Sequence, residues 1–243
     1  MFEKILKFKA SKDYLKHKPF LPEPTKLNIP EWYKKIKHKF DLKTIKGCIP
    51  FLDTLTIGYV LKTPIDLRIQ FNCEENKNKF NSISSLINHP YGDFANLNTR
   101  PDGHPIEQLS KECPYVNKNK DLPFLKILNP WTIVTPPGYS CLFVPPLNNT
   151  DDKFSIIPGI VDTDTFPLKV NFPIIINGDK YPVLDTIIKM GTPYVQIIPF
   201  RRESWKMKIE STPRIEETTQ QFGFQFKMLN VYKEKWWSKK SWK

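Results

Sequence analysis

The stretch "IDLRIQF", residues 65–71, gives the clearest indication of the fold. Apolar and polar residues alternate along it: Ile65, Leu67, Ile69 and Phe71 form one set, and Asp66, Arg68 and Gln70 form the other. Because successive side chains of a β-strand point to opposite faces, this spacing predicts a strand with one buried and one solvated face. The preceding "GYVLK", residues 58–62, is also typical of a strand.

Six more strand-like segments lie between residues 121 and 210. They are "WTIVT" (131–135), "SCLFV" (140–144), "FSIIPGIVD" (154–162), "LKVNFPIIING" (168–178), "YVQIIPF" (194–200) and "SWKMKIE" (204–210). Turn signals separate them, and 23 Pro against 9 Gly disfavour long interior helices. The sequence therefore predicts a mainly β fold, built as a single barrel or a sandwich such as a jelly roll.

Three regions are expected along the chain. Residues 1–46 form a basic, proline-containing arm with a short helix that starts near Pro30. Residues 47–210 form the β domain, which includes a long polar excursion at 74–120. Residues 211–243 form a C-terminal helix, capped by Thr212, and an aromatic, basic tail.

The positive charge is concentrated at the two ends. The net charge is +12 at pH 7, of which residues 1–46 carry +8 and residues 227–243 carry +5, so residues 47–226 carry −1. The cations of both ends are lysines, whereas nucleic-acid-binding domains usually also use arginine for phosphates and base edges. We therefore expect the ends to bind a protein partner, with nucleic acid as a second candidate.

The four cysteines indicate neither a metal centre nor an oxidised framework. Cys48, Cys73, Cys113 and Cys141 are far apart, and no CxxC or Cys/His cluster accompanies them, so no metal and no cofactor is expected. The N-terminal "MFEKILKFKASKD" lacks the apolar core of a signal peptide, and no apolar run approaches the roughly 20 residues of a membrane span. A non-secreted protein is expected.

Part of the β region resembles the trimeric dUTPase family. The segments "PPGYSCLFVPP", "GIVDTDTF" and "MGTPYVQIIPF", within residues 136–200, are similar in order to three segments of that family. The resemblance implies a dUTPase-like β fold and a Mg-dependent nucleotide diphosphohydrolase. Asp162 would deprotonate the attacking water, Asp164 would bind ligand, and Gln196 would be structural. In the family, an aromatic residue comes one position after the second aspartate, whereas Phe166 comes two positions after Asp164.

Two other parts of the family pattern differ here. The place of the family's Arg-Ser-Gly phosphate loop reads "VPPLNNTDD", and prolines offer no backbone N–H to a phosphate. The glycine-rich C-terminal lid is replaced by "QQFGFQF", which has one glycine. A shared strand architecture without the activity is therefore the alternative.

Most of the chain also resembles uncharacterised proteins of tailed phages that infect marine bacteria. The segments that carry this likeness are "IPEWYKKIK", "IKGCIPFLDTLTIGYVLKTPIDLRI", "PFRRESWK" and "WWSKKSWK". It implies no particular reaction. It does imply a location in the cytoplasm of an infected host or in a virion.

Two further groups of residues are candidates for binding. Arg201 and Arg202 could hold a phosphate or carboxylate, or pair with Glu203, Glu210 or the acids at 216 and 217. The tail residues Tyr232, Trp236, Trp237 and Trp242 are interleaved with lysines. They are suited to docking onto a protein, to stacking on single-stranded nucleic acid, or to a membrane surface, and docking is the preferred interpretation.

These observations favour a phage-encoded structural or interaction protein, such as a virion component, that binds a protein partner through its basic, aromatic ends. A homo-oligomer is compatible with this role. The alternative is a nucleotide-binding or nucleotide-hydrolysing enzyme on a dUTPase-like β fold. The sequence favours the first, because the phosphate loop and the lid are both altered.

Overall fold

The computed structural model divides the chain into two compact units. One comprises Met1–Glu23 and Gly58–Arg201, and the other comprises Pro24–Ile57 and Arg202–Lys243. The structure describes residues 4–16, 18–37, 44–75, 77–86, 95–96, 110–149, 151–226 and 232–243. Residues 76, 87–94 and 97–109 of the predicted polar excursion at 74–120 therefore lie outside the described residues.

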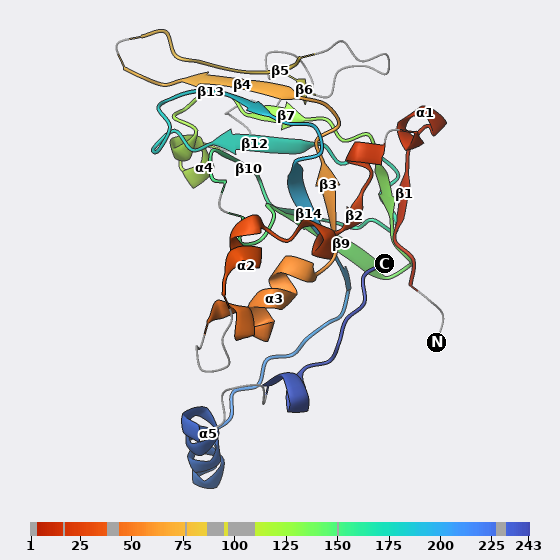
Figure 1. Cartoon of the computed structure of the whole chain (residues 1–243), viewed down its shortest axis with the longest axis vertical. Helices are drawn as coiled ribbons and strands as arrows, with labels where there is room; N and C mark the ends of the chain where they lie inside the picture. The colour runs from red at the N-terminus through yellow and green to blue at the C-terminus, as the bar shows by residue number, and fades with distance from the viewer. Residues whose placement is uncertain are drawn as a thin grey trace. The chain divides into compact units, whose positions relative to one another are not determined.

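The first unit is built from antiparallel sheets (Figure 1). The largest has the order β11-β9-β14-β3-β2, with β11 at Gly159–Val161, β9 at Tyr139–Val144, β14 at Pro193–Arg201, β3 at Tyr59–Lys62 and β2 at Glu23–Pro24. A second has the order β10-β12-β7-β6, with β10 at Phe154–Ile156, β12 at Phe172–Ile176, β7 at Leu125–Ile127 and β6 at Ala95–Asn96.

Two smaller sheets complete this unit. The three-stranded sheet has the order β13-β4-β5, with β13 at Val183–Ile188, β4 at Leu67–Asn72 and β5 at Phe80–Ser85. The N-terminal β1, Lys7–Lys9, pairs with β8, Thr132–Val134. Two short helices also belong to this unit, α1 at Lys12–Leu15 and α4 at Pro114–Lys118, together with a 3₁₀ turn at Lys18–Phe20.

The alternation that predicted the first strand is confirmed. In β4, Leu67, Ile69 and Phe71 are buried, while the residues between them are partly exposed. On its outer face, Arg68 makes a bidentate ion pair with Asp185 of β13. The two residues thus join neighbouring strands on the solvated side of the sheet.

Aromatic side chains join the two larger sheets of the first unit. The ring of Phe172 on β12 lies 5.5 Å from the ring of Phe143 on β9 and 5.7 Å from that of Tyr194 on β14. All three are almost fully buried and belong to one continuous apolar core. Edge and tilted aromatic contacts at this separation stabilise the packing beyond the area that they bury.

The N-terminal arm contributes to the same core. Tyr14 and Phe20 are buried, and the ring of Phe20 lies 6.2 Å from that of Trp131. The arm also adds β1 to the strand that follows Trp131. The part of the arm up to Glu23 therefore belongs to the folded first unit, whereas the part from Pro24 onwards belongs to the second.

The prediction of a mainly β fold is confirmed, but the prediction of a single barrel is wrong for the described strands. They form several open antiparallel sheets, and none of these closes on itself. One cause lies in "FSIIPGIVD", which we expected to be one strand. It is interrupted before Gly159 and supplies β10 to one sheet and β11 to another. Pro158 lacks the N–H that a continuous ladder would need.

The second unit contains helices and turns. They are α2 at Glu31–Lys35, α3 at Ile49–Thr56, α5 at Arg214–Phe226, 3₁₀ turns at Thr25–Asn28 and Ile45–Gly47, and a π-type turn at Tyr232–Trp236. The short helix expected after Pro30 is confirmed as α2, where Tyr33 stacks on Phe51 of α3 at 5.9 Å. The C-terminal helix is also confirmed, although it begins two residues after the expected cap at Thr212.

The predicted strand at 204–210 is not a strand. No strand of the described part of the chain is paired with it. Alternation favours extended backbone, but a strand also needs a neighbour that accepts its hydrogen bonds.

In the described part of the chain, no helix is long and apolar enough to cross a membrane.

We expect Gly58→Ala to destabilise the first unit by about 2–3 kcal/mol. Gly58 has a φ of +72°, and a Cβ there would lie 2.0 Å from the carbonyl oxygen of Ile197. Gly159→Ala is the matched control, because a Cβ at Gly159 meets no atom within 4 Å. Chemical denaturation of both variants checks this expectation, and equal stabilities would contradict it.

Candidate functional site

Three of the four predicted catalytic and ligand-binding residues lie at one end of the five-stranded sheet. Arg201, the last residue of β14, is opposite Tyr139 at the start of β9. Val161, the last residue of β11, is opposite Cys141 on the same strand, so Asp162 and Asp164 follow at that same end. Arg202 belongs to the other unit. The strand register therefore brings together residues that are far apart in sequence.

Both aspartates accept hydrogen bonds from the segment that leads into β9. The hydroxyl of Ser140 donates to Asp162 Oδ1 at 2.6 Å, and the backbone N–H of Gly138 donates to Asp164 Oδ2 at 2.8 Å. The carbonyl of Asp162 in turn accepts the N–H groups of Thr165 and Phe166 at 3.1 and 2.9 Å. These contacts make the "DTDTF" segment a tight hydrogen-bonded corner between strands.

A buried threonine lies between the two aspartates. Thr163 is 1% exposed, and its hydroxyl oxygen lies 2.9 Å from that of Thr135 and 3.3 Å from the sulfur of Cys141. Burial raises the pKa of the Cys141 thiol to about 11. Because a thiol with such a pKa stays protonated near neutral pH, Cys141 acts here as a buried packing residue.

The outer side of the corner borders a surface depression of about 420 Å³. Its walls are formed by Ile160, Val161, Asp162, Thr165, Phe166 and Pro167. Asp162 is exposed, so its carboxylate is accessible to a ligand. Phe166 lines the same depression, although its position in the sequence did not match the stacking residue of the dUTPase pattern.

In the described part of the loop after β9, two backbone N–H groups bond within the chain. The N–H of Leu147 donates to Oε1 of the buried Gln196, and the N–H of Asn149 donates to the carbonyl of Pro146. The structural role expected for Gln196 agrees with this contact. Among the described residues of this loop, two of the backbone donors that a triphosphate could use are thus already bonded within the chain. Across the described residues, no group of three or more His, Cys, Asp and Glu could hold a metal ion.

The two arginines are both exposed. Lys4, at the same sheet end as Arg201, places its ammonium 5.0 Å from the ring centre of Tyr139. Glu210, one of the acids named above as candidates to pair with the arginines, makes an ion pair with Lys208. In the first unit, the sheet end that carries Asp162 and Asp164 therefore also carries the cations of Arg201 and Lys4.

The aromatic residues of the tail differ in exposure. Tyr232 and Trp236 are 43% and 68% exposed, whereas Trp237 and Trp242 are half-buried. The indole N–H of Trp237 donates to both carboxylate oxygens of Asp53 on α3, at 3.2 and 3.0 Å. Lys240 donates to the same carboxylate at 2.5 Å and lies 5.7 Å from the centre of the Trp237 ring.

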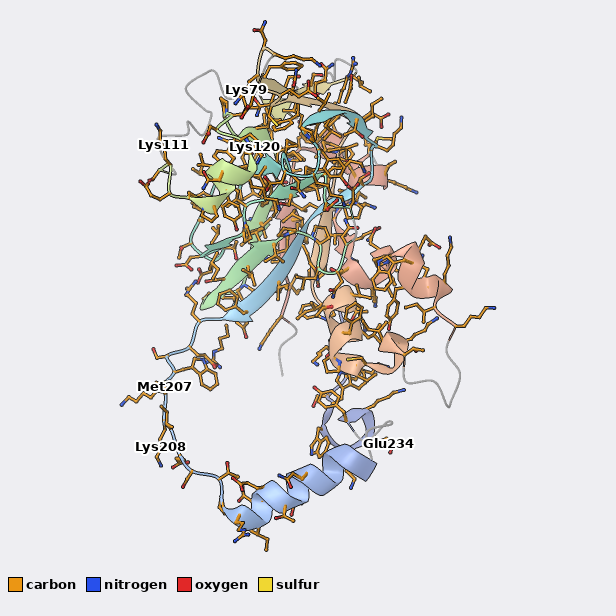
Figure 2. The ribbon with its side chains drawn as sticks, turned by 90° about the vertical axis from the view of Figure 1, so that its left-hand side faces the viewer. Lys79, Lys111, Lys120, Met207, Lys208 and Glu234 are labelled. Atoms are coloured by element: carbon orange, nitrogen blue, oxygen red, sulfur yellow. The ribbon has the colours of Figure 1, made fainter. Side chains whose placement is uncertain are left out.

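This contact divides the predicted partner-binding residues into two groups. Trp237 already has a partner within its own chain, and Tyr232 and Trp236 remain accessible on the turn that also carries Glu234 (Figure 2). Sequence reasoning missed Asp53 altogether. Its residue type carries no special signal in "IPFLDTLT", and its partner lies 184 positions further along the chain.

Comparison with known proteins adds no family or relative. No family model matches the chain, and no curated protein matches it either.

We expect Thr163→Val to lower the free energy of unfolding by about 1–2 kcal/mol, because it removes a buried hydroxyl from the contacts with Thr135 and Cys141. Thr165→Val is the control. Thr165 is exposed and its hydroxyl bonds only a nearby carbonyl, so its loss should change stability by less than about 0.5 kcal/mol. Urea titration measures both. A larger effect at position 165 would mean that the corner is stabilised differently.

We expect Asp53→Ala to release the segment 232–243 from α3, since both Trp237 and Lys240 lose their acceptor. Hydrogen–deuterium exchange in this segment should become faster. Glu31→Ala removes an exposed ion pair with Lys34 in the same unit and should leave that exchange unchanged. Unchanged exchange in Asp53→Ala would show that the tail is held by other contacts.

Proposed function

We propose that this chain is a phage-encoded structural or interaction protein that binds a protein partner through its C-terminal part, as a component of a virion. The observation that carries the proposal is the exposure of large apolar side chains after residue 201. Trp205, Met207 and Ile209 are 85%, 88% and 85% exposed, and Trp236 is 68% exposed. Exposed side chains of this size are typical of surfaces that a partner covers.

The charge distribution supports the same proposal. Residues 227–243 carry +5, and Lys233 and Lys235 lie beside the exposed Tyr232 and Trp236 on one turn. Aromatic anchors surrounded by charge are a common composition of protein interfaces, in which the aromatic residues supply most of the affinity and the charges orient the partner.

The alternative function, nucleotide hydrolysis on a dUTPase-like fold, has one supporting observation. Asp162 and Phe166 line the same depression. Against it stand the loop after β9, whose Leu147 and Asn149 N–H groups are used within the chain, and the hydrogen bond that Ser140 donates to Asp162. These contacts favour a structural corner, so we rank the partner-binding function first.

The decisive experiment measures the chain in purified phage particles. We expect mass spectrometry to detect it there, and a double variant, Tyr232→Ala with Trp236→Ala, to reduce its incorporation by about 10- to 30-fold, as loss of an aromatic hot spot does. Both side chains are exposed, so the fold should be unaffected. Detection in the infected lysate alone would contradict the virion role.

Two controls separate the explanations. Lys233→Gln with Lys235→Gln alters the same turn but keeps its aromatic residues, and should have a smaller effect. For the alternative, nucleoside triphosphates with Mg²⁺ should leave the Tm unchanged. A rise in Tm, with turnover that Asp162→Asn abolishes, would favour the enzyme over the interaction protein.

A further inference from the structure

The segment 204–210, "SWKMKIE", has the pattern of a strand and no strand beside it. Its apolar residues Trp205, Met207 and Ile209 occupy every second position, with Lys206 and Lys208 between them. Figure 2 shows Met207 and Lys208 on a drawn-out stretch of ribbon that leads towards α5. Within the described residues, no other strand is paired with this stretch.

Its side chains divide between two sides as they would in a strand. Lys208 and Glu210, two residues apart, make an ion pair with each other, so they lie on one side. In extended backbone the residues at odd positions point to the opposite side. Trp205, Met207 and Ile209 thus form an apolar row that is more than four-fifths exposed.

We propose that this segment pairs antiparallel with the same segment of a second copy of the chain, about a two-fold axis at Lys208. The inference rests on the proposed function, because it names one partner of an assembly protein. A two-fold axis makes the contact self-complementary, so each copy supplies the same row and the same unpaired backbone groups.

The charges of the segment select this register. With the axis at Lys208, Lys206 of each copy is opposite Glu210 of the other, and Met207 is opposite Ile209. With the axis at Met207, Lys206 would be opposite Lys208 in both halves of the ribbon. In the first register Lys208 is also opposite Lys208 of the other copy, so this register has one like-charged pair and two oppositely charged pairs, whereas the second has two like-charged pairs and no oppositely charged pair. Because like charges directly opposite each other destabilise a strand pair and opposite charges stabilise it, the first register is favoured.

The apolar face of the paired strands continues onto the start of α5. In the favoured register, Trp205 of one copy is opposite Ser211 of the other, three residues before Arg214, where α5 begins. Ile215 in the first turn of α5 is 78% exposed. The three apolar residues of each copy together form one face of the two-stranded ribbon. A two-stranded ribbon is stable only when another element packs on such a face, and the two α5 helices begin beside it.

The purified full chain tests the pairing directly. Light scattering from micromolar to submillimolar concentration should give a mass of twice 28.6 kDa. Replacing Trp205, Met207 and Ile209 by Ser should weaken the dimer by at least about 100-fold. Ile160→Ser with Leu168→Ser, which alters two apolar residues of the first unit that are each 63% exposed, should leave it intact. A monomer at every concentration, or a dimer that survives the triple variant, would overturn the proposal.

Cysteine cross-linking tests the register in a background with the exposed Cys48 replaced by Ser. In the Lys208→Cys variant, the two introduced cysteines are directly opposite each other, with about 4.5–5.5 Å between their Cα atoms. This separation suits a disulfide. In the Lys206→Cys variant, the Cα atoms of the two introduced cysteines are about 13 Å apart, so no disulfide should form. Cross-linking at position 206, or none at 208, would overturn the pairing that we propose.

The outcomes for this inference and for the proposed function are independent. Self-association is measured on the chain alone, whereas the proposed function is measured by incorporation into particles and by Tyr232 and Trp236. A monomeric chain that still enters particles would refute the strand pairing and retain the function. A dimer that never enters particles would support the strand pairing and refute the proposed function.

Discussion

The packing of two antiparallel sheets through Phe143, Phe172 and Tyr194 is the contact on which the rest of the first unit depends. These rings come from β9, β12 and β14, so a single aromatic cluster fixes the face that each of the two larger sheets must bury. Once those faces are set, the ends of β9, β11 and β14 are aligned, and the aspartate corner takes its position at the sheet end.

The hydrogen bonds of that corner give its aspartates a structural role, whatever the resemblance of the segment to the dUTPase pattern implies. A carboxylate at a strand end needs donors, and here Ser140 and the Gly138 backbone supply them. In the loop after β9, the backbone N–H groups of Leu147 and Asn149 likewise donate to acceptors within the chain. Polar groups that satisfy each other stabilise a turn, and they are then less available to a substrate.

In the second unit, the exposed apolar side chains are the basis of the proposal that a partner binds there. The contact of Trp237 with Asp53 shows that one tryptophan of the tail finds cover within the chain. Trp205, Met207, Ile209 and Trp236 do not find it among the described residues. Large apolar side chains in water carry a hydration cost that burial at an interface removes.

The amino-acid sequence by itself determined the periodic features: the buried and exposed faces of β4, the helices α2 and α5, and the separation of charge between the ends and the body. These depend on residues near one another in the chain, where a repeat of two or of 3.6 is visible directly. Tertiary structure alone decided that "FSIIPGIVD" serves two sheets and that Asp53 accepts a hydrogen bond from Trp237. It also decided that, among the described strands, no sheet closes and none pairs with 204–210. Each of these depends on which distant segments meet, and partner choice is set by long-range packing that local periodicity does not encode.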